Sequence, residues 1–241
     1  MTPYVVLSPH PDDAVLSAWH VLVSPHQVQV VTIFAGIPTP GFVTRLDHAH
    51  GATDSAAWMR RRLADDRASL ALAGRRPHHL DLVEVQYRAH QARQRVTAEE
   101  LRSRLQPFIH PEAVVYVPSG IGGHPDHCDV AGSMAWLTAT GHQVRLYGDT
   151  PYYFVRHGLP SWVGGTANPR ADAMIEAALA ALPHPPDHLS RHVVELTPTE
   201  LARKQQAIRR YRTEAAALYA ELSTAPSDPA MLRYEVHWAV G

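Results

Sequence analysis

Residues 4–17 read YVVLSPHPDDAVLS, and this stretch decides the fold. Its first part, Tyr4–Leu7, is short, apolar and mostly β-branched, which predicts a buried parallel strand. A histidine and two adjacent aspartates follow in the loop SPHPDD, residues 8–13. Ala14–Val23 then has the apolar spacing of a helix. A strand, a polar loop and a helix in this order begin an α/β unit.

The same alternation of strands and helices continues to about residue 150. Further strands are predicted over 27–34, 79–87, 113–118, 143–147 and 193–196. Further helices are predicted over 56–73, 97–109, 128–139, 171–182 and 198–222. Residues 35–54 are rich in Gly, Pro and His and predict a long loop. We therefore expect one α/β domain over residues 1–241, with a Rossmann-like, mainly parallel sheet flanked by helices.

Composition narrows the class of protein. The chain has 241 residues, 45% of them hydrophobic, and a formal net charge of -1, so no global field recruits nucleic acid. Cys128 is the only cysteine, which excludes a disulfide within the chain and a thiolate zinc finger. No apolar run reaches the ~20 residues that span a bilayer. With no secretory signal at the N-terminus, a cytoplasmic location is expected. A homo-oligomer is neither indicated nor excluded.

A second polar loop resembles the first. SGIGGHPDH, residues 119–127, follows the predicted strand 113–118 and again contains His-Pro-Asp. Ligands of open α/β sheets bind at the carboxyl ends of the strands, where loops from distant parts of the chain meet. We expect these two loops to meet there. Either motif alone is typical of a solvated turn, and the site hypothesis rests on finding both after strands.

The residue types in the two loops fit a metal ion. Catalytic zinc usually has three protein ligands and one open position. His10 and Asp13 can reach a common ion from one tight loop, and His127 can supply the third ligand. The set predicts one Zn²⁺ per chain, although Fe²⁺ also accepts two histidines and one carboxylate. Cys128, on a helix, points away from its neighbour and is expected to be a packed residue.

The remaining polar residues of the loops suggest hydrolysis. Asp12 lies beside the predicted ligands and can act as general base toward a water that the ion activates. His124, as an imidazolium, can stabilise a developing oxyanion and protonate a leaving nitrogen. Asp126 can orient one of these histidines or raise its pKa.

At these residues the sequence resembles the PIG-L/LmbE-type family of zinc-dependent N-deacetylases. Ser8–Asp13 matches the family's Ala/Ser-x-His-Pro-Asp-Asp motif, and His124–His127 matches its His-x-Asp-His motif. The resemblance implies the same ligands, base and electrostatic residue, and it implies an N-acetyl amino sugar or a sugar-bearing natural product as substrate.

The sequence also departs from that family. Many members have glutamate where this chain has Ala14, and some have a tyrosine where it has Gly122. A tyrosine acting on the oxyanion must therefore come from elsewhere or be absent.

Other segments give weaker indications about substrate binding. Arg61 or Arg62 is a candidate for contacting hydroxyls or a phosphate, although a solvated helix face is the more common role. Tyr147 and Asp149 follow a predicted strand and are candidates for the rim of a pocket. Residues 151–165 contain four aromatics and suit either a lid or plain packing.

The sequence therefore predicts a zinc-dependent hydrolase that removes an N-acetyl or N-acyl group from a small amino-sugar substrate. Three alternatives remain open. They are an amidase that cleaves a larger acyl or thiol-conjugate amide, a metal-dependent sugar-binding protein without turnover, and a phosphoesterase. Phosphoesterases often use two metals, and only one ligand set is evident.

Overall fold

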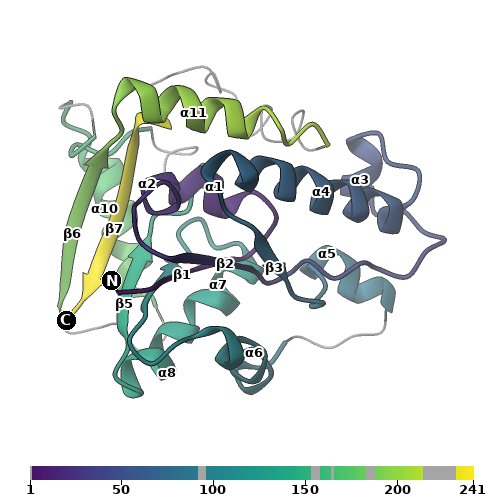
Figure 1. Cartoon of the computed structure of the whole chain (residues 1–241), viewed down its shortest axis with the longest axis horizontal. Helices are drawn as coiled ribbons and strands as arrows, with labels where there is room; N and C mark the ends of the chain where they lie inside the picture. Colours follow the sequence, from purple (N-terminus) through teal and green to yellow (C-terminus); the bar gives the residue numbers. More distant parts are fainter. Residues whose placement is uncertain (1, 92–95, 153–157, 164–165, 183–187, 214–231) are drawn as a thin grey trace.

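A seven-stranded sheet forms the centre of the molecule, in the order β3-β2-β1-β4-β5-β7-β6 (Figure 1). The computed structural model describes residues 2–91, 96–152, 158–163, 166–182, 188–213 and 232–241. The strands are β1 (Tyr4–Ser8), β2 (Val28–Thr32), β3 (Pro77–His79), β4 (Val114–Pro118), β5 (Gln143–Tyr147), β6 (Leu189–Glu195) and β7 (Tyr234–Val240). The first five strands pair in parallel, whereas β7 is antiparallel to both β5 and β6. The expected mainly parallel α/β sheet is confirmed.

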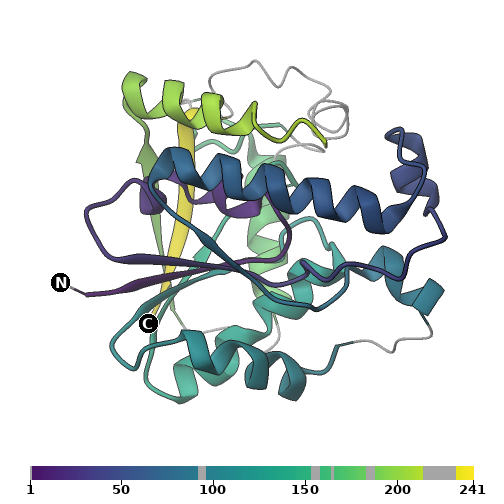
Figure 2. The same ribbon diagram turned by 45° about the vertical axis from the view of Figure 1, so that its right-hand side comes forward.

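Helices cover both faces of this sheet (Figures 1 and 2). One face carries α1 (Asp13–Ser17), α2 (Trp19–Leu22), α4 (Ser55–Leu70) and α11 (Pro198–Ile208). The other carries α6 (Ala98–Leu105), α7 (Pro125–Ala131), α8 (Ser133–Ala139) and α10 (Pro169–Ala180). Two short helices, α3 (Arg45–Ala49) and α5 (Val85–Arg88), lie beyond the carboxyl ends of the strands. No helix among the described residues is both long and apolar enough to cross a membrane.

The side-chain alternation of β1 divides the core into two layers. Val5 and Leu7 pack with α6, α7, α8 and α10, whereas Val6 packs with α1, α2 and α11. All three side chains are buried. A strand buried on both faces explains why Tyr4–Leu7 is continuously apolar rather than alternating.

The predicted helix over residues 14–23 is wrong in one respect, because it is two helices. The backbone breaks at Ala18, which has φ -136°. Beyond the break, the backbone N–H groups of Trp19 and His20 donate to the buried carboxylate of Glu235, over 2.8 and 2.7 Å. The second helix thus begins where its free N–H groups can bind an anion, an interaction that local sequence does not reveal.

The predicted strand over residues 79–87 is also wrong over most of its length. Strand β3 ends at His79, and Val85–Arg88 forms α5. The N–H of Val85 and the guanidinium of Arg88 both donate to Asp126, which lies about 40 positions away in sequence. These long-range contacts override the local β preference of the segment.

Three further predictions need smaller corrections. The loop 35–54 contains α3, whose N-cap Thr44 accepts from the N–H of Asp47. The helix over 128–139 begins at Pro125 and divides into α7 and α8 at Gly132. The last helix, α11, ends at Ile208, and residues 214–222 lie outside the described part of the chain.

Strand β7 was not predicted. Its sequence, YEVHWAV, is rich in aromatic and β-branched residues, which is a signal for a strand, and residues 235–238 are all buried. The strand lies between β5 and β6 and therefore completes the sheet.

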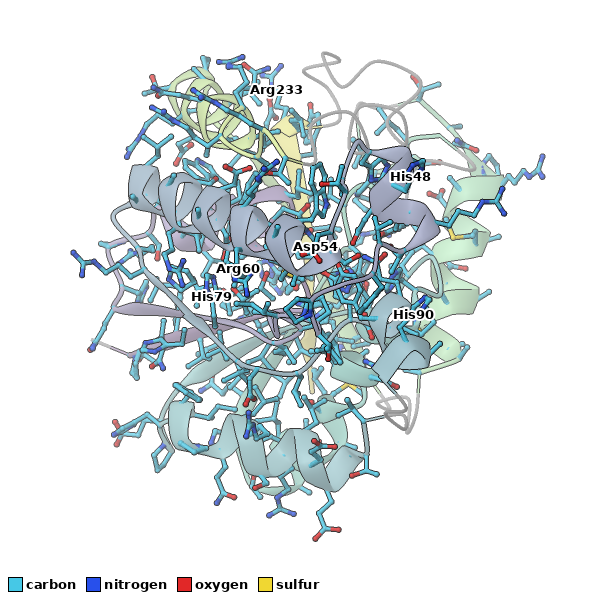
Figure 3. The ribbon with its side chains drawn as sticks, turned by 90° about the vertical axis from the view of Figure 1, so that its right-hand side faces the viewer. His48, Asp54, Arg60, His79, His90 and Arg233 are labelled. Atoms are coloured by element: carbon cyan, nitrogen blue, oxygen red, sulfur yellow. The ribbon has the colours of Figure 1, made fainter. Side chains whose placement is uncertain are left out.

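Hydrogen bonds hold the segment that contains α3 in place. Asp54 accepts from the N–H of Ala57 as the N-cap of α4 and also from the N–H of Gly41. His48, also labelled in Figure 3, lies on α3 and is exposed. The segment between β2 and α4 is therefore anchored over the carboxyl ends of the strands.

Candidate active site

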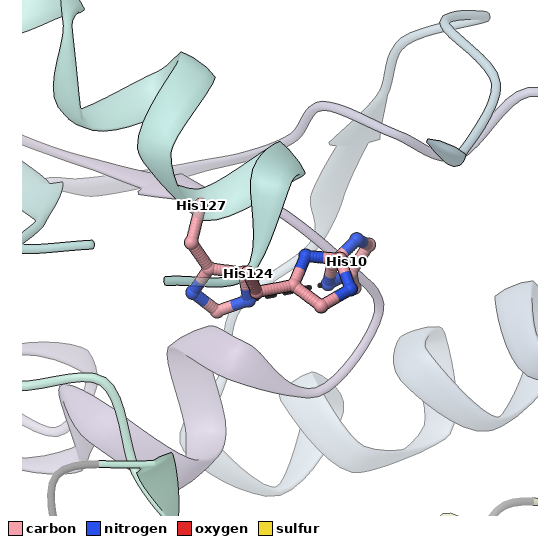
Figure 4. Close-up of side chains that lie close together, drawn as sticks. All are labelled: His10, His124 and His127. Atoms are coloured by element: carbon pink, nitrogen blue, oxygen red, sulfur yellow. Dashed lines mark hydrogen bonds between the residues drawn. The ribbon is translucent and has the colours of Figure 1, made fainter. Parts of the chain in front are cut away.

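The two His-Asp loops meet at the carboxyl ends of β1 and β4, as expected. These strands are neighbours, and the chain leaves them in opposite directions across the sheet, from β1 toward β3 and from β4 toward β5. Ligands of doubly wound folds bind at such a reversal of strand order. The imidazole rings of His10, His124 and His127 gather there (Figure 4), and one nitrogen from each lies within 4.8 Å of the other two.

A tighter set of three atoms includes Asp13 in place of His124. Oδ2 of Asp13 lies 3.4 Å from Nδ1 of His10 and 3.3 Å from Nε2 of His127. Those two nitrogens are themselves 3.3 Å apart. Donor atoms about 2.0–2.1 Å from an ion at tetrahedral angles lie roughly 3.3–3.4 Å from one another. The three atoms thus have the spacing of one face of a tetrahedral metal site.

Charge in this cluster is concentrated on Asp13 and the two rings that face it. Burial alone would lower the pKa of His10, but hydrogen bonds to Asp126 and Asp13 raise it to about 9. Burial would likewise lower the pKa of His127, and Asp13 and Asp149 raise it to about 10. Burial opposes ionisation of Asp13, yet both histidines hold its pKa well below the usual range. The cluster therefore holds protons that an incoming cation would displace.

Asp12 has an unusual backbone conformation. Its φ is 116°, and among the described residues it is the sole non-glycine with positive φ. Its carbonyl accepts from the N–H groups of Val15 and Leu16, so the turn closes directly into α1. The buried Asp12 side chain lines the same pocket as His10 and Asp13. Strain of this kind is commonly found at functional sites.

His124 is the N-cap of α7 and lines the pocket. Its Nδ1 accepts from the N–H of Asp126 over 3.3 Å, which leaves Nε2 as the protonated nitrogen of a neutral ring. Burial and the neighbouring His10 and His127 lower its pKa to about 4. The expected imidazolium is therefore disfavoured in this structure, but a neutral ring can still donate a hydrogen bond from Nε2.

Asp126 contacts one of the predicted ligands, His10, and its expected role in orienting a histidine stays a prediction. Its Oδ2 accepts from Nε2 of His10 over 2.9 Å and from the N–H of Val85 over 3.0 Å. Its Oδ1 accepts from the guanidinium of Arg88 over 2.5 Å. Because Nε2 of His10 is used in this way, its Nδ1 faces Asp13 and His127.

The outer wall of the pocket comes from α3, α4 and the start of α5. Arg62 lines it and forms an ion pair with Glu84, whose other oxygen accepts from the side-chain amide of Gln86. Of the two arginines considered from sequence, Arg62 reaches the pocket and Arg61 is exposed. Leu46 on α3 also lines the pocket, and 52% of it is exposed.

Two residues near the end of β5 have positions that the sequence did not indicate. Asp149 does not lie at a pocket rim, because it is fully buried and accepts from Nδ1 of His127 over 2.7 Å. Tyr152 lines the pocket, with its ring centroid 5.3 Å from that of His127. A Cβ at Gly122 would lie 2.5 Å from Cβ of Tyr152. Tyr152 thus takes the space beside the second loop that a side chain at position 122 would need.

The structure also places the other residues near the pocket that the sequence analysis singled out. Tyr147 is buried and donates to the carbonyl of Leu7, so it is a packing residue. Cys128 lies outside the metal-like cluster, with its Sγ 3.7 Å from the carbonyl of Gly120. In the aromatic segment 151–165, Trp162 packs against Trp238, and residues 153–157 and 164–165 lie outside the described chain.

Solved structures share this fold over the whole chain. The zinc-inhibited form of teicoplanin deacetylase Orf2 matches with a TM-score of 0.72 and 24% identity, over 100% of this chain and 98% of that one. The A40926 pseudoaglycone deacetylase Dbv21 matches with a TM-score of 0.71 and 24% identity, over 100% and 97%. N,N'-diacetylchitobiose deacetylase from Pyrococcus horikoshii matches with a TM-score of 0.59 and 15% identity, over 100% and 84%. At these identities the likeness establishes the fold.

Sequence comparison identifies the family. No curated protein matches the chain. The family model described as PIG-L, GlcNAc-PI de-N-acetylase, matches residues 5–146, which include both His-Asp loops. Since this match spans more than half of the chain, the protein belongs to the PIG-L family.

Proposed function

We propose that the protein is a metal-dependent N-deacetylase that hydrolyses the N-acyl group of an amino sugar carried on a small natural product. The observation that carries the proposal is the trio of donor atoms from His10, Asp13 and His127, 3.3–3.4 Å apart, beside the strained Asp12. Residues 1–241 are proposed to act as one deacetylase domain, because β5 and β7 extend the sheet on which both loops lie.

His10, Asp13 and His127 are the proposed ligands of the ion, which we expect to be one Zn²⁺, with Fe²⁺ as the alternative. A divalent ion held there polarises the amide carbonyl and lowers the pKa of an adjacent water. The fit of two imidazole nitrogens and one carboxylate oxygen to a tetrahedral face supports this assignment.

Asp12 is the proposed general base, since its buried carboxylate lines the pocket next to the ligands. It takes a proton as the water oxygen bonds to the amide carbon. Nε2 of His124 donates to the oxyanion that develops on the carbonyl oxygen. The proton held by Asp12 then passes to the leaving nitrogen as the C–N bond breaks, so a carboxylate and a free amine are formed.

A neutral glycoside is the proposed class of substrate. By their names, two of the matching structures are a teicoplanin deacetylase and an A40926 pseudoaglycone deacetylase, and a third is a deacetylase–teicoplanin complex. In the described part of the pocket, carboxylates predominate and Arg62 is paired with Glu84. This charge balance suits a hydroxyl-bearing sugar better than a phosphate, which argues against the phosphoesterase alternative.

Two alternatives remain distinct from this proposal. An amidase with a larger acyl group would use the same chemistry, and the exposed Leu46 at the pocket is compatible with it. A sugar-binding protein without turnover would retain the ligands but gains nothing from a strained Asp12. The cytoplasmic location and the oligomeric state stay predictions.

Amine release with and without metal tests the proposal. The purified protein is assayed with fluorescamine on N-acetylglucosaminides, on N-hexanoyl and N-decanoyl glucosaminides, and on N-acetyl amino acids as non-sugar amides. We expect release from a glucosaminide, loss of release after chelation, and recovery with one equivalent of Zn²⁺ or, without oxygen, Fe²⁺. Faster release from the long acyl chains would favour the amidase. Metal binding without release from any substrate would favour the binding protein.

A further inference from the structure

The environment of His127 differs from that of the other cluster histidines in one respect. Its Nδ1 lies 2.7 Å from Oδ1 of Asp149, a carboxylate that follows β5 and belongs to neither His-Asp loop. Asp149 is 0% exposed and does not line the pocket, so it has no direct contact with a substrate bound there. Its effect on chemistry must therefore pass through His127.

The second oxygen of Asp149 is fixed independently. Oδ2 accepts from Oγ of Ser119 over 2.5 Å and from the N–H of Ile121 over 3.1 Å. Both donors lie on the loop between β4 and α7, and His127 lies in the first turn of α7, directly after this loop. The carboxylate thus bridges the start of this loop and the histidine in the helix that follows it, and its Oδ1 is directed at the ring.

The sheet fixes where Asp149 lies. Tyr147 donates to the carbonyl of Leu7 on β1, and the N–H of Ser119 donates to the carbonyl of Tyr147. Beyond Asp149, the N–H of Thr150 donates to Oγ of Ser17 on α1. The backbone on both sides of Asp149 is therefore tied to the elements that position the first loop.

A carboxylate on Nδ1 determines which nitrogen of His127 carries a lone pair. A carboxylate oxygen can only accept, so the ring must donate from Nδ1. Nε2, the atom 3.3 Å from both Asp13 and His10, is then the nitrogen available to bind an ion. Asp126 does the same for His10 through the opposite nitrogen, Nε2. Each of the two rings is thus matched to its own carboxylate.

We propose that Asp149 is a positioning residue that, with Ser119, holds His127 in the orientation and tautomer that direct Nε2 toward the metal. This inference rests on the proposed metal site. Partners of this kind typically change metal affinity by about 10–100-fold when they are removed.

Asp149→Asn tests the proposal. Its amide oxygen can accept from Ser119 and Ile121, so the NH₂ group faces Nδ1 and forces the ring proton onto Nε2. Metal affinity is measured by competition with a chelator, using Zn²⁺ and Co²⁺, and the Co²⁺ absorption spectrum reports ligand geometry. We expect the dissociation constant to rise at least tenfold, the Co²⁺ spectrum to change, and kcat to fall with KM unchanged, because Asp149 does not line the pocket.

Asp66→Asn is the matched control. Asp66 is equally buried, and it also accepts from a histidine nitrogen, Nε2 of His79, and from two hydroxyls, those of Thr32 and Tyr211. It lies outside the metal-like cluster. We expect it to lower the melting temperature without changing metal affinity or the Co²⁺ spectrum. If both variants lower the melting temperature and Asp149→Asn binds metal as the wild type does, Asp149 is only structural and the proposal is overturned.

Two measurements keep the proposal testable if Asp149→Asn does not fold. Ser119→Ala retains the carboxylate and loosens it, so we expect a smaller rise in the dissociation constant. In the Zn²⁺-loaded wild type with ¹⁵N-labelled histidine, NMR should show a proton on Nδ1 of His127 and the ion on Nε2, and the reverse arrangement overturns the proposal. Failure of the wild type to bind metal would instead contradict the proposed function.

Discussion

Asp12→Asn is expected to reduce kcat by about 10²–10⁴-fold while the protein keeps its metal. Asparagine has the same shape as aspartate and is among the residues that best tolerate positive φ, so the strained turn at φ 116° should persist. What the variant loses is a carboxylate that can accept a proton in the pocket. The measurement is steady-state amine release together with metal analysis of the same sample.

The control for this variant is the metal content itself. If Asp12→Asn loses its metal along with activity, Asp12 is a ligand or supports one, and its assignment as base is wrong. A variant with normal metal content and near-normal kcat would show that another group takes the proton from water. Loss of kcat with metal retained is the result that the general-base role requires.

Glu235→Gln is expected to destabilise the fold by about 3–5 kcal/mol, the cost of leaving a buried charge without its partner. Glu235 on β7 accepts from the ammonium of Lys204 on α11 over 2.6 Å and from His20 over 2.6 Å. Lys204 and Glu235 are both almost completely buried. Urea unfolding followed by circular dichroism measures the loss. Neither Glu235 nor its partners line the pocket, so metal content should not change.

Glu195→Gln provides the comparison. Glu195 pairs with Arg233 over 2.5 Å, but both side chains are about half exposed. Exposed ion pairs contribute about 0–1 kcal/mol, so this variant should unfold near the wild-type urea concentration. Equal effects from the two variants would mean that the buried pair is not an anchor between α11 and β7.

The free energy of unfolding at acid pH should depend on the carboxylate of Glu235. Burial alone would raise the pKa of Glu235, but Lys204 and His20 lower it to about 2. A depressed pKa stabilises the fold above the unfolded-state value of 4.5, and this contribution is lost as the pH falls from 4.5 toward about 2. The difference in unfolding free energy between wild type and Glu235→Gln should therefore shrink across that pH range. If the difference in unfolding free energy stays constant across that pH range, the Glu235 carboxylate is not the source of the pH dependence.

The two His-Asp loops allowed the location of the candidate site to be predicted from the sequence. His10, Asp12 and Asp13 are neighbours in the chain, as are His124, Asp126 and His127, and parallel strands bring the two groups to one edge of the sheet. Short-range spacing and one rule of sheet topology were enough to place them together.

Residues held by distant partners could not be found in this way. Asp149 contacts His127 across 22 positions, and Arg88 contacts Asp126 across 38. Glu235 binds the start of α2 from more than 200 positions away, which also explains why the predicted helix over 14–23 is divided. Local patterns do not contain such contacts, so one helix was predicted over 14–23 and a strand over 79–87, and the break at Ala18 and the helix α5 were missed.

Metal content and amine release, measured together in four proteins, test the central claim most directly. The four are the wild type, Asp13→Ala, His127→Ala and His110→Ala, the last removing an exposed histidine outside the cluster. We predict about one equivalent of metal and amine release in the wild type and in His110→Ala, with both lost in the two other variants. Full metal content and activity in Asp13→Ala and His127→Ala would contradict the assignment of this site.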